Sequence, residues 1–401
     1  MGDISDNTEL LRQMSAHAVH VSRLYALLLL HEGQFDNRLE YGRLSYRFAA
    51  TAKGIDDFCM DFYSRRLPNV HWTWLGVPEA ALQDSNHETI STAIKVSITA
   101  VQILGKTLLA RCHPLEKSCP ESDLVFSLDD GGVTPGSCFD LPSCRFDETD
   151  PTPRKAFAGP KTANCHSAFI PQYDLSVWRS PKFSDDIDET LAYLWTLSLL
   201  ESGAASLCAL NAVEYDGLPL PFYVDMAKQV WDEMRHAVLC LRTVDVLIPH
   251  ASSDGKVREI LDVYKSTGSG LPVPLQINLY EAIWNADLEE RLVLMHHDTE
   301  TPGIKSLTQE LHSSCCALYP EIGELFRILL RDEVTHSRIG SKWLKFLLPK
   351  SEERARVIEN TRLLRSIYLL TSFATTGNIS LSQALKKSVR APMPPVYLAD
   401  G

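Results

Sequence analysis

The chain has 401 residues, a hydrophobic content of 45% and a formal net charge of −12. This length and composition are typical of a soluble protein with a large core and two or three domains. The negative charge argues against an extended nucleic-acid surface, which needs clustered lysine and arginine side chains to neutralise phosphates.

Neither a membrane span nor a secretory signal is evident in the sequence. The longest apolar run, residues 24–30, is far shorter than a bilayer requires. The first residues lack the charged segment with which a secretory peptide begins. We therefore expect a cytoplasmic protein without a membrane or nucleic-acid partner.

The first part of the chain, residues 1–112, is predicted to be a helical region. Apolar residues recur at helical spacing over residues 8–65, with a break at Gly33, and again over residues 88–111. Proline, glycine, serine, aspartate and cysteine then dominate residues 113–182, and no helical period survives there. We interpret that segment as a long irregular linker or lid.

Two helices joined by a short turn are predicted to follow. The first spans about residues 186–213 and carries Glu201 within an apolar stretch, where a carboxylate needs a cation or a proton. The second begins near Phe222 and carries Glu233 and His236. Because Glu201 and Glu233 are about equally far from the turn, an antiparallel hairpin would place them at the same height.

A third helix is predicted from Pro274 to about His297, and a fourth from about Pro320 to residue 348. The third offers Glu281, Glu289 and Glu290, and its expected end favours either of the last two. The fourth carries Glu333 and His336, and an extra short helix is expected before it. Residues 349–401 are predicted to form a last helix and a tail.

The fourth helix repeats a pattern of the second, because each carries a Glu-x-x-His box preceded by aspartate. Residues three apart lie on one face of a helix, so a carboxylate and an imidazole at this spacing can bind one metal ion together. A single such pair is often a solvated surface pair, but two pairs in helices with apolar faces indicate a buried site. Two accidental boxes in a purely structural helical protein are the alternative.

The pattern resembles the ferritin-like di-iron carboxylate superfamily. The matching elements are Glu201, Asp232-Glu233-Met234-Arg235-His236, Leu288-Glu289-Glu290-Arg291 and Asp332-Glu333-Val334-Thr335-His336. The resemblance implies an all-α fold with a ferritin-like four-helix bundle over residues 183–348, to which the N-terminal helical region and the irregular linker are additions.

The resemblance also implies a set of metal ligands for two iron ions, with manganese left open. Glu233 and Glu333 would bridge the ions, and no catalytic residue is expected beyond the ligands. Asp232 and Asp332 would hold the imidazole N–H groups across the bundle. The implied ligands are Glu201, Glu233, His236, Glu289, Glu333 and His336, with Glu290 and Glu281 as alternatives to Glu289.

The function implied by this resemblance is that of a di-iron oxygenase or oxidase that uses O2 to oxidise a small molecule. Hydroxylation, N-oxygenation and oxidative cleavage all stay open, and so does homodimerisation. Electrons would come from an external donor or from the substrate, because the sequence has no nucleotide-binding motif. The alternative is a non-catalytic iron-binding or storage protein, which the long N-terminal region disfavours.

Overall fold

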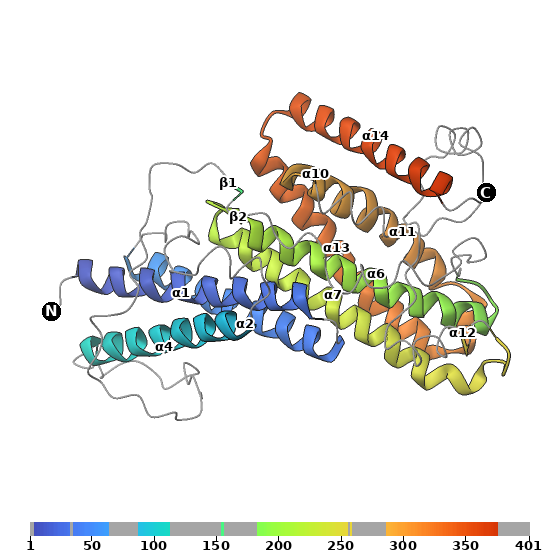
Figure 1. The fold of residues 1–401 in the computed structure, drawn as a ribbon, viewed down its shortest axis with the longest axis horizontal. Helices are drawn as coiled ribbons and strands as arrows, with labels where there is room; N and C mark the ends of the chain where they lie inside the picture. Colours follow the sequence, from blue (N-terminus) through green and yellow to red (C-terminus); the bar gives the residue numbers. More distant parts are fainter. Residues whose placement is uncertain are drawn as a thin grey trace. The chain divides into compact units, whose positions relative to one another are not determined.

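The structure, a computed structural model, describes residues 4–32, 35–63, 87–112, 154–155, 183–255, 257–258 and 286–375. Nearly all of these residues are helical, which confirms the predicted all-α class. The elements are α1 (Ile4–His31), α2 (Phe35–Tyr63), α4 (His87–Cys112), β1 (Arg154–Lys155), α6 (Ile187–Glu214), β2 (Tyr215–Asp216), α7 (Leu220–Leu247), η4 (Ile248–His250), α10 (Leu288–Leu292), η5 (Val293–Glu300), α11 (Thr301–Glu310), α12 (Ser314–Leu318), α13 (Pro320–Leu347) and α14 (Ser351–Thr375) (Figure 1).

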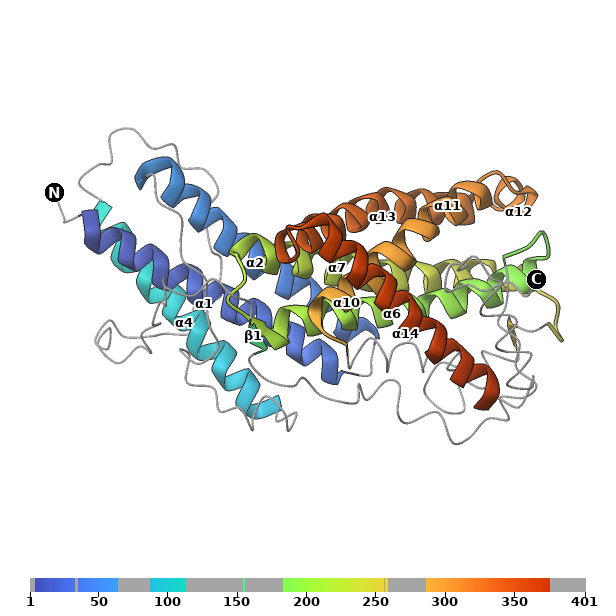
Figure 2. The same ribbon diagram turned by 90° about the horizontal axis from the view of Figure 1, so that it is seen from above.

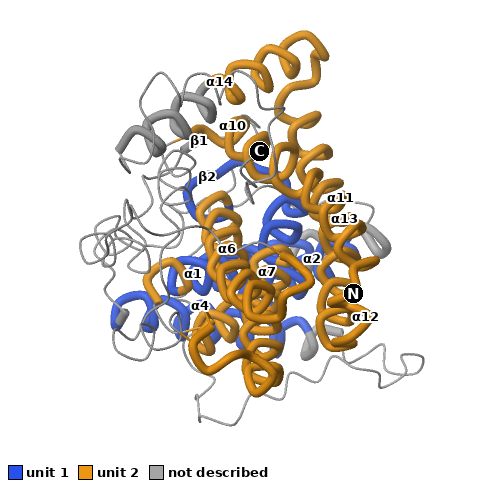
Figure 3. The backbone as a smooth tube through the Cα atoms, turned by 90° about the vertical axis from the view of Figure 1, so that its right-hand side faces the viewer, with its two compact units in different colours: residues 1–28, 44–159, 212–227 blue, residues 29–43, 160–211, 228–401 orange. Residues whose placement is uncertain are grey.

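The chain divides into two compact units, and neither is continuous in sequence (Figure 3). Unit 1 comprises residues 1–28, 44–159 and 212–227, and unit 2 comprises residues 29–43, 160–211 and 228–401. The division cuts through α1, α2, α6 and α7. The predicted linker, apart from β1, and the predicted tail after Thr375 lie outside the described residues.

In unit 1, α1 packs against α2 and also fixes the segment that follows α6. The rings of Tyr25 and Phe48 stack with their centroids 6.0 Å apart. Arg23 is buried and forms an ion pair of 2.6 Å with Asp216 in β2. Its guanidinium also donates to the carbonyl of Val213, 3.1 Å away. A buried arginine thus stabilises the end of α6 through charge-assisted hydrogen bonds.

The turn between α6 and α7 is short and depends on one glycine. Gly217 has a φ of 79°, in the left-handed region that residues with a Cβ seldom adopt. The β2 strand just before it pairs antiparallel with β1, with Arg154 opposite Asp216. α6 and α7 are therefore joined with few intervening residues, as the sequence predicted.

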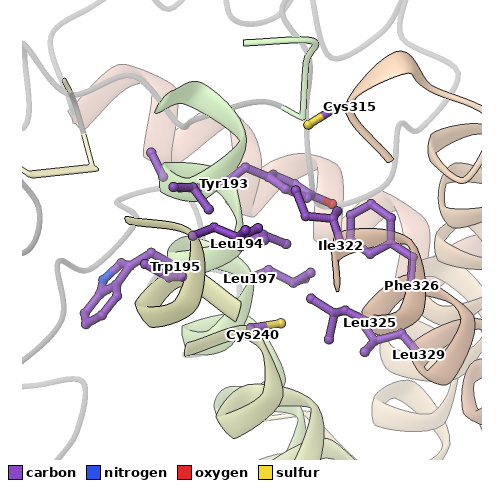
Figure 4. Close-up of a cluster of buried hydrophobic side chains, with 14 of the residues drawn as sticks. Tyr193, Leu194, Trp195, Leu197, Cys240, Cys315, Ile322, Leu325, Phe326 and Leu329 are labelled. Carbon is purple, nitrogen blue, oxygen red and sulfur yellow. The ribbon is translucent and has the colours of Figure 1, made fainter. Parts of the chain in front are cut away.

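Unit 2 has an apolar core to which α6, α7, α11, α12 and α13 contribute (Figure 4). Leu197 of α6 and Leu325 and Phe326 of α13 are fully or almost fully buried within it. The core reaches Leu200, the residue just before Glu201. Glu201 therefore lies at the boundary of this apolar core.

The third helical segment of unit 2 contains a π-helical stretch. α10, η5 and α11 follow one another without a break from Leu288 to Glu310, and η5 is the π-helical part. The hydroxyls of Thr299 and Thr301 donate to the carbonyls five residues earlier, at 2.8 and 3.2 Å. α14 packs against α10 and η5 (Figure 2).

The prediction that this helix ends near His297 is wrong. The sequence Thr301-Pro302-Gly303 suggested a break, but Pro302 continues the helical segment directly after the π-helical part η5. Helical structure therefore extends to Glu310, and the extra helix expected between residues 301 and 319 corresponds to α11 and α12.

One of the described helices, α6, is long and apolar enough to cross a membrane. However, 89% of its most apolar window is buried inside the structure. This burial is typical of the core helix of a soluble protein, because a helix in lipid would expose that surface.

Candidate metal centre

Six buried side chains form two overlapping groups inside unit 2. Within each group, one ligand atom from every residue lies within 4.8 Å of the others. None of the six residues exposes more than 7% of its surface. The first group is Glu201, Glu233, His236 and Glu333, and the second is Glu233, Glu300, Glu333 and His336.

Helical periodicity places these side chains. In α7 and again in α13, the glutamate and the histidine of one box lie three residues apart on the same helix face. Glu233 and Glu333 belong to both groups, so each can serve two ions. Glu201 from α6 completes the first group, and Glu300, the last residue of η5, completes the second.

Both imidazoles direct Nδ1 toward the carboxylates. His236 Nδ1 lies 3.4 Å from Glu233 Oε2 and 3.6 Å from Glu201 Oε2. His336 Nδ1 lies 3.1 Å from Glu233 Oε1 and 3.2 Å from Glu333 Oε2. The Nδ1 atoms are therefore the imidazole atoms available to a metal ion.

The Nε2 atom of each imidazole faces an aspartate of the other box. His236 Nε2 lies 3.3 Å from Asp332 Oδ2, and His336 Nε2 lies 3.3 Å from Asp232 Oδ2. A carboxylate accepts the Nε2–H, which leaves the Nδ1 lone pair free to face the centre. Each aspartate therefore fixes the ring orientation and tautomer of the histidine on the opposite helix.

Basic side chains at the periphery of the cluster balance the negative charge of the two aspartates. Lys228 and Arg235 both contact Asp232, and Arg235 also forms an ion pair with Asp332. Together with His236 and Arg331, Arg235 holds the pKa of Asp332 at about 2, although burial acts in the opposite direction. Asp332 is therefore ionised near neutral pH and can accept a hydrogen bond from the imidazole Nε2–H of His236.

Without an ion, protons compensate the charge of this cluster. Burial raises the pKa of Glu201 and of Glu300 well above its ordinary value, and neighbouring glutamates raise it further. Burial alone would lower the pKa of His236, but Asp332, Glu201 and Glu233 together raise it well above its usual range. The cluster therefore retains protons that a metal ion would displace.

The polar atoms at the centre favour occupation by a metal ion. Glu233 Oε2 and His236 Nδ1 are buried and have no hydrogen-bond partner within the described part of the chain. Burying such atoms is costly unless they have a partner, and a cation at this position would contact both. Carboxylate oxygens and imidazole nitrogens suit iron or manganese better than thiolate-binding metals. The residues present therefore fit a pair of such ions.

On the third helical segment, the structure brings a different glutamate to the centre from the one predicted. Glu290 accepts a hydrogen bond of 3.1 Å from the Asp287 N–H and thus caps α10. Glu289 lies in the same first turn, roughly 16 Å along the helix from Glu300 at about 1.5 Å per residue. Glu281 lies outside the described residues.

The sequence does contain a signal for Glu300, which the prediction missed. Glu300 precedes Glu333 by almost the same number of residues as Glu201 precedes Glu233. The two halves of the centre thus share one spacing between the single glutamate and the box. The other predicted ligands, Glu201, Glu233, His236, Glu333 and His336, all lie in the cluster.

Comparison with known proteins adds no family to this description. No protein-family model matches the chain, and no curated protein or solved structure is detectably similar to it.

Proposed function

We propose that the chain binds two iron ions at this centre and uses O2 to oxidise a small molecule. The observation that carries the proposal is the pair of overlapping groups that share Glu233 and Glu333. A shared pair of carboxylates can hold two ions close together, which a single group cannot. In this proposal α6, α7, the segment from η5 to α11, and α13 form a ferritin-like four-helix bundle.

Each residue of the cluster has a defined part. Glu201 and His236 serve the first position, Glu300 and His336 serve the second, and Glu233 and Glu333 serve both. Two ferrous ions held there supply the electrons and coordination positions needed to activate O2. Manganese suits the same ligands, and elemental analysis of the protein as purified, before any metal is added, distinguishes the two.

The surrounding protein keeps water away from the centre. All six candidate ligands are buried, and the apolar core of unit 2 begins at Leu200. A dry interior strengthens electrostatic interactions and limits loss of reactive species to solvent. If one oxygen atom enters the substrate and the other becomes water, the reaction consumes two electrons and two protons. An external electron donor supplies these electrons.

Elemental analysis of the purified protein after anaerobic loading with ferrous iron tests the metal site. We expect about two ions per chain in the wild type. The variants Glu333→Gln and His336→Ala should lose at least one of them. Glu324→Gln changes an exposed glutamate of the same helix and should bind as the wild type does. Wild-type protein that binds no metal would overturn the proposal.

Oxygen uptake separates an oxidase or oxygenase from a protein that only binds iron. The ferrous protein is mixed with O2 in a closed cell containing a chemical reductant, and O2 is followed with an electrode. Continued uptake that depends on His336 supports the enzymatic function. Two bound ions without sustained uptake would instead support iron binding or storage.

A further inference from the structure

A buried glutamine connects two of the candidate ligands. The Gln229 side chain is fully buried and lies one helical turn before Glu233 on α7. Its Nε2 donates to Glu233 Oε1 at 3.0 Å and to Glu300 Oε1 at 3.2 Å. An amide nitrogen has two hydrogens, so these two bonds use its full donor capacity. Gln229 therefore holds carboxylates from two different helices at a fixed separation.

His296 fixes the orientation of this amide. The His296 ring is buried, and its Nε2 lies 2.8 Å from Gln229 Oε1. Because Oε1 can only accept, His296 Nε2 is the donor. Rotating the amide by half a turn would place Oε1 against the carboxylates and Nε2 against this N–H, which replaces attractions with repulsions. His296 thus keeps the amide donors directed at Glu233 and Glu300.

A glycine on α13 makes room for His296. A Cβ atom at position 340 would lie 2.1 Å from His296 Cβ and 2.5 Å from its Cγ. Gly340 is one turn beyond His336 on the same helix. α13 therefore supplies a candidate ligand at one turn and space for the His296 ring at the next.

These contacts favour the second ion position, because they hold its own glutamate, Glu300, in addition to the shared Glu233. Glu300 belongs to the second group alone, and Glu201, the corresponding residue of the first group, has no hydrogen bond to Gln229 among those observed in the described residues. We propose that Gln229 and His296 are positioning residues that preorganise the second position, so that it binds its ion more tightly and fills first. Preorganised ligands lose less conformational freedom on binding. This inference depends on the proposed two-ion centre.

The test is an anaerobic titration of the metal-free protein with Mn2+, in which electron paramagnetic resonance measures the free ion. The wild type should show two ions with distinguishable affinities. Gln229→Leu and His296→Phe should weaken the tighter ion by about 10-fold to 100-fold, the usual cost of removing a residue that orients a ligand. Gln309→Leu, an exposed change on α11, should leave both affinities unchanged.

Two further variants separate positioning from general damage. His296→Gln can still donate one N–H toward Gln229 and should recover at least part of the lost affinity, whereas Phe has no donor. Glu201→Gln should lose the weaker ion and retain the tighter one. Circular dichroism identifies any variant that has lost its helices. If the Gln229 and His296 variants are lost in this way, Glu201→Gln still tests which position fills first.

The outcomes distinguish failure of this inference from failure of the two-ion centre. Wild-type protein that binds no Mn2+ or Fe2+ overturns both. Two ions with unchanged affinities in folded Gln229→Leu and His296→Phe overturn the inference alone. Loss of the tighter ion in Glu201→Gln also overturns it, because the first position would then fill first.

Discussion

At the scale of single residues, Glu300 is the ligand candidate that decides how the second position is built. It is buried at the end of η5, beside Glu233, Glu333 and His336. We expect Glu300→Gln to lower the metal content from about two ions to about one per chain, because an amide oxygen is a much weaker ligand than a carboxylate. Glu289→Gln removes the same charge at the start of α10 and should have no effect.

Elemental analysis of both variants measures this difference. Circular dichroism should show equal helicity, since both substitutions preserve size. If Glu289→Gln lost an ion while Glu300→Gln kept both, the assignment of Glu300 would be wrong.

Asp232 and Asp332 orient histidines rather than contact the metal position. Replacing either by asparagine removes the negative charge that holds the imidazole N–H. We expect each change to weaken metal affinity by about 10-fold to 100-fold. Competition with a coloured chelator measures this affinity, and Asp245→Asn, an exposed change on α7, should match the wild type. Unchanged affinity in both variants would exclude the orienting role.

The residues of the cluster differ in how far the sequence reveals them. The two boxes could be recognised because the α-helical period alone places Glu233 beside His236 and Glu333 beside His336. Glu300 was missed because it follows the predicted end of the third helix near His297, although its spacing from Glu333 resembles that of Glu201 from Glu233. Gln229 and His296 carry no motif, and only their approach in space gives them a role.

At the scale of elements, Gly340 sets how closely η5 can approach α13. Alanine is the better helix former, yet a Cβ at this position would overlap His296. We expect Gly340→Ala to lower the free energy of unfolding by about 1–3 kcal/mol, the usual cost of overpacking. Gly303→Ala in α11 meets no atom within 4 Å and should raise it by roughly 0.5–1 kcal/mol.

Urea denaturation of these two variants gives the comparison directly. We expect the two substitutions to change the free energy of unfolding in opposite directions. Both glycines lie in helices, but only a Cβ at Gly340 would overlap another side chain. Equal stabilisation by both alanines would mean that η5 and α13 are farther apart than the structure places them.

Arg38 ties the connection between α1 and α2 to α6 within unit 2. Its buried guanidinium donates to the Leu29 carbonyl and the Ser202 carbonyl, both at 2.8 Å, and to Ser206 Oγ at 2.6 Å. Arg38→Met would remove these buried hydrogen bonds from a charged donor, although the Leu29 and Ser202 carbonyls keep the Glu32 N–H and the Ser206 hydroxyl as donors. We expect a loss of about 2–4 kcal/mol in the free energy of unfolding, since a hydrogen bond to a charged group contributes about 1.5–3 kcal/mol.

The exposed Arg43 offers a matched control on the same helix. It pairs only with Glu40 among the ion pairs observed in the described parts of α2, so Arg43→Met should change stability by less than about 0.5 kcal/mol. Because Ser202 adjoins Glu201, Arg38→Met should also weaken metal binding. A destabilisation of Arg38→Met no larger than that of Arg43→Met would contradict this role.

Helices could be predicted well from periodicity, and their ends less well. α1, α2, α4, α6 and α13 begin and end within a few residues of the predicted positions, and α7 begins within a few residues of its predicted start. The third helix predicted within residues 183–348 ends too early, near His297, because proline and glycine usually end a helix. Here the preceding π-helical turns let the chain continue, and no sequence rule announces such turns.

At the scale of the whole molecule, the charge of the centre links stability to pH and to metal. In the metal-free protein the pKa values of His236 and His336 lie well above 6.5, and those of Glu201 and Glu300 lie well above 4.5. Between the ordinary and the raised pKa values the folded protein binds more protons than the unfolded chain. These four groups therefore lower the stability as the pH rises, whereas the lowered pKa values of His20 and His296 act in the opposite direction only up to about pH 6.5, so that the stability falls above 6.5.

Metal loading should remove this dependence, because ions replace the protons. We expect chelator-treated protein to unfold at a lower urea concentration at pH 7.5 than at pH 6, and loaded protein to show no such decline. The lowered pKa of Glu233 acts only at more acidic pH and does not alter the sign. Greater stability of the metal-free protein at pH 7.5 would contradict the expectation.

The arrangement of the units was not accessible from the sequence. Composition separates segments that differ in character, such as residues 113–182, whereas the units are defined by contacts between distant segments. Residues 29–43 belong to unit 2 through side chains such as Arg38, and nothing in their own composition indicates that partner.

The crossed aspartate–histidine pairs mean that neither box is a transferable module. The histidine of α7 is oriented by the aspartate of α13, and the histidine of α13 by the aspartate of α7. A fragment with one box therefore carries two halves of different pairs and no complete one. Grafting one such helix onto another scaffold would transfer the glutamate and the histidine without the aspartate that orients this histidine.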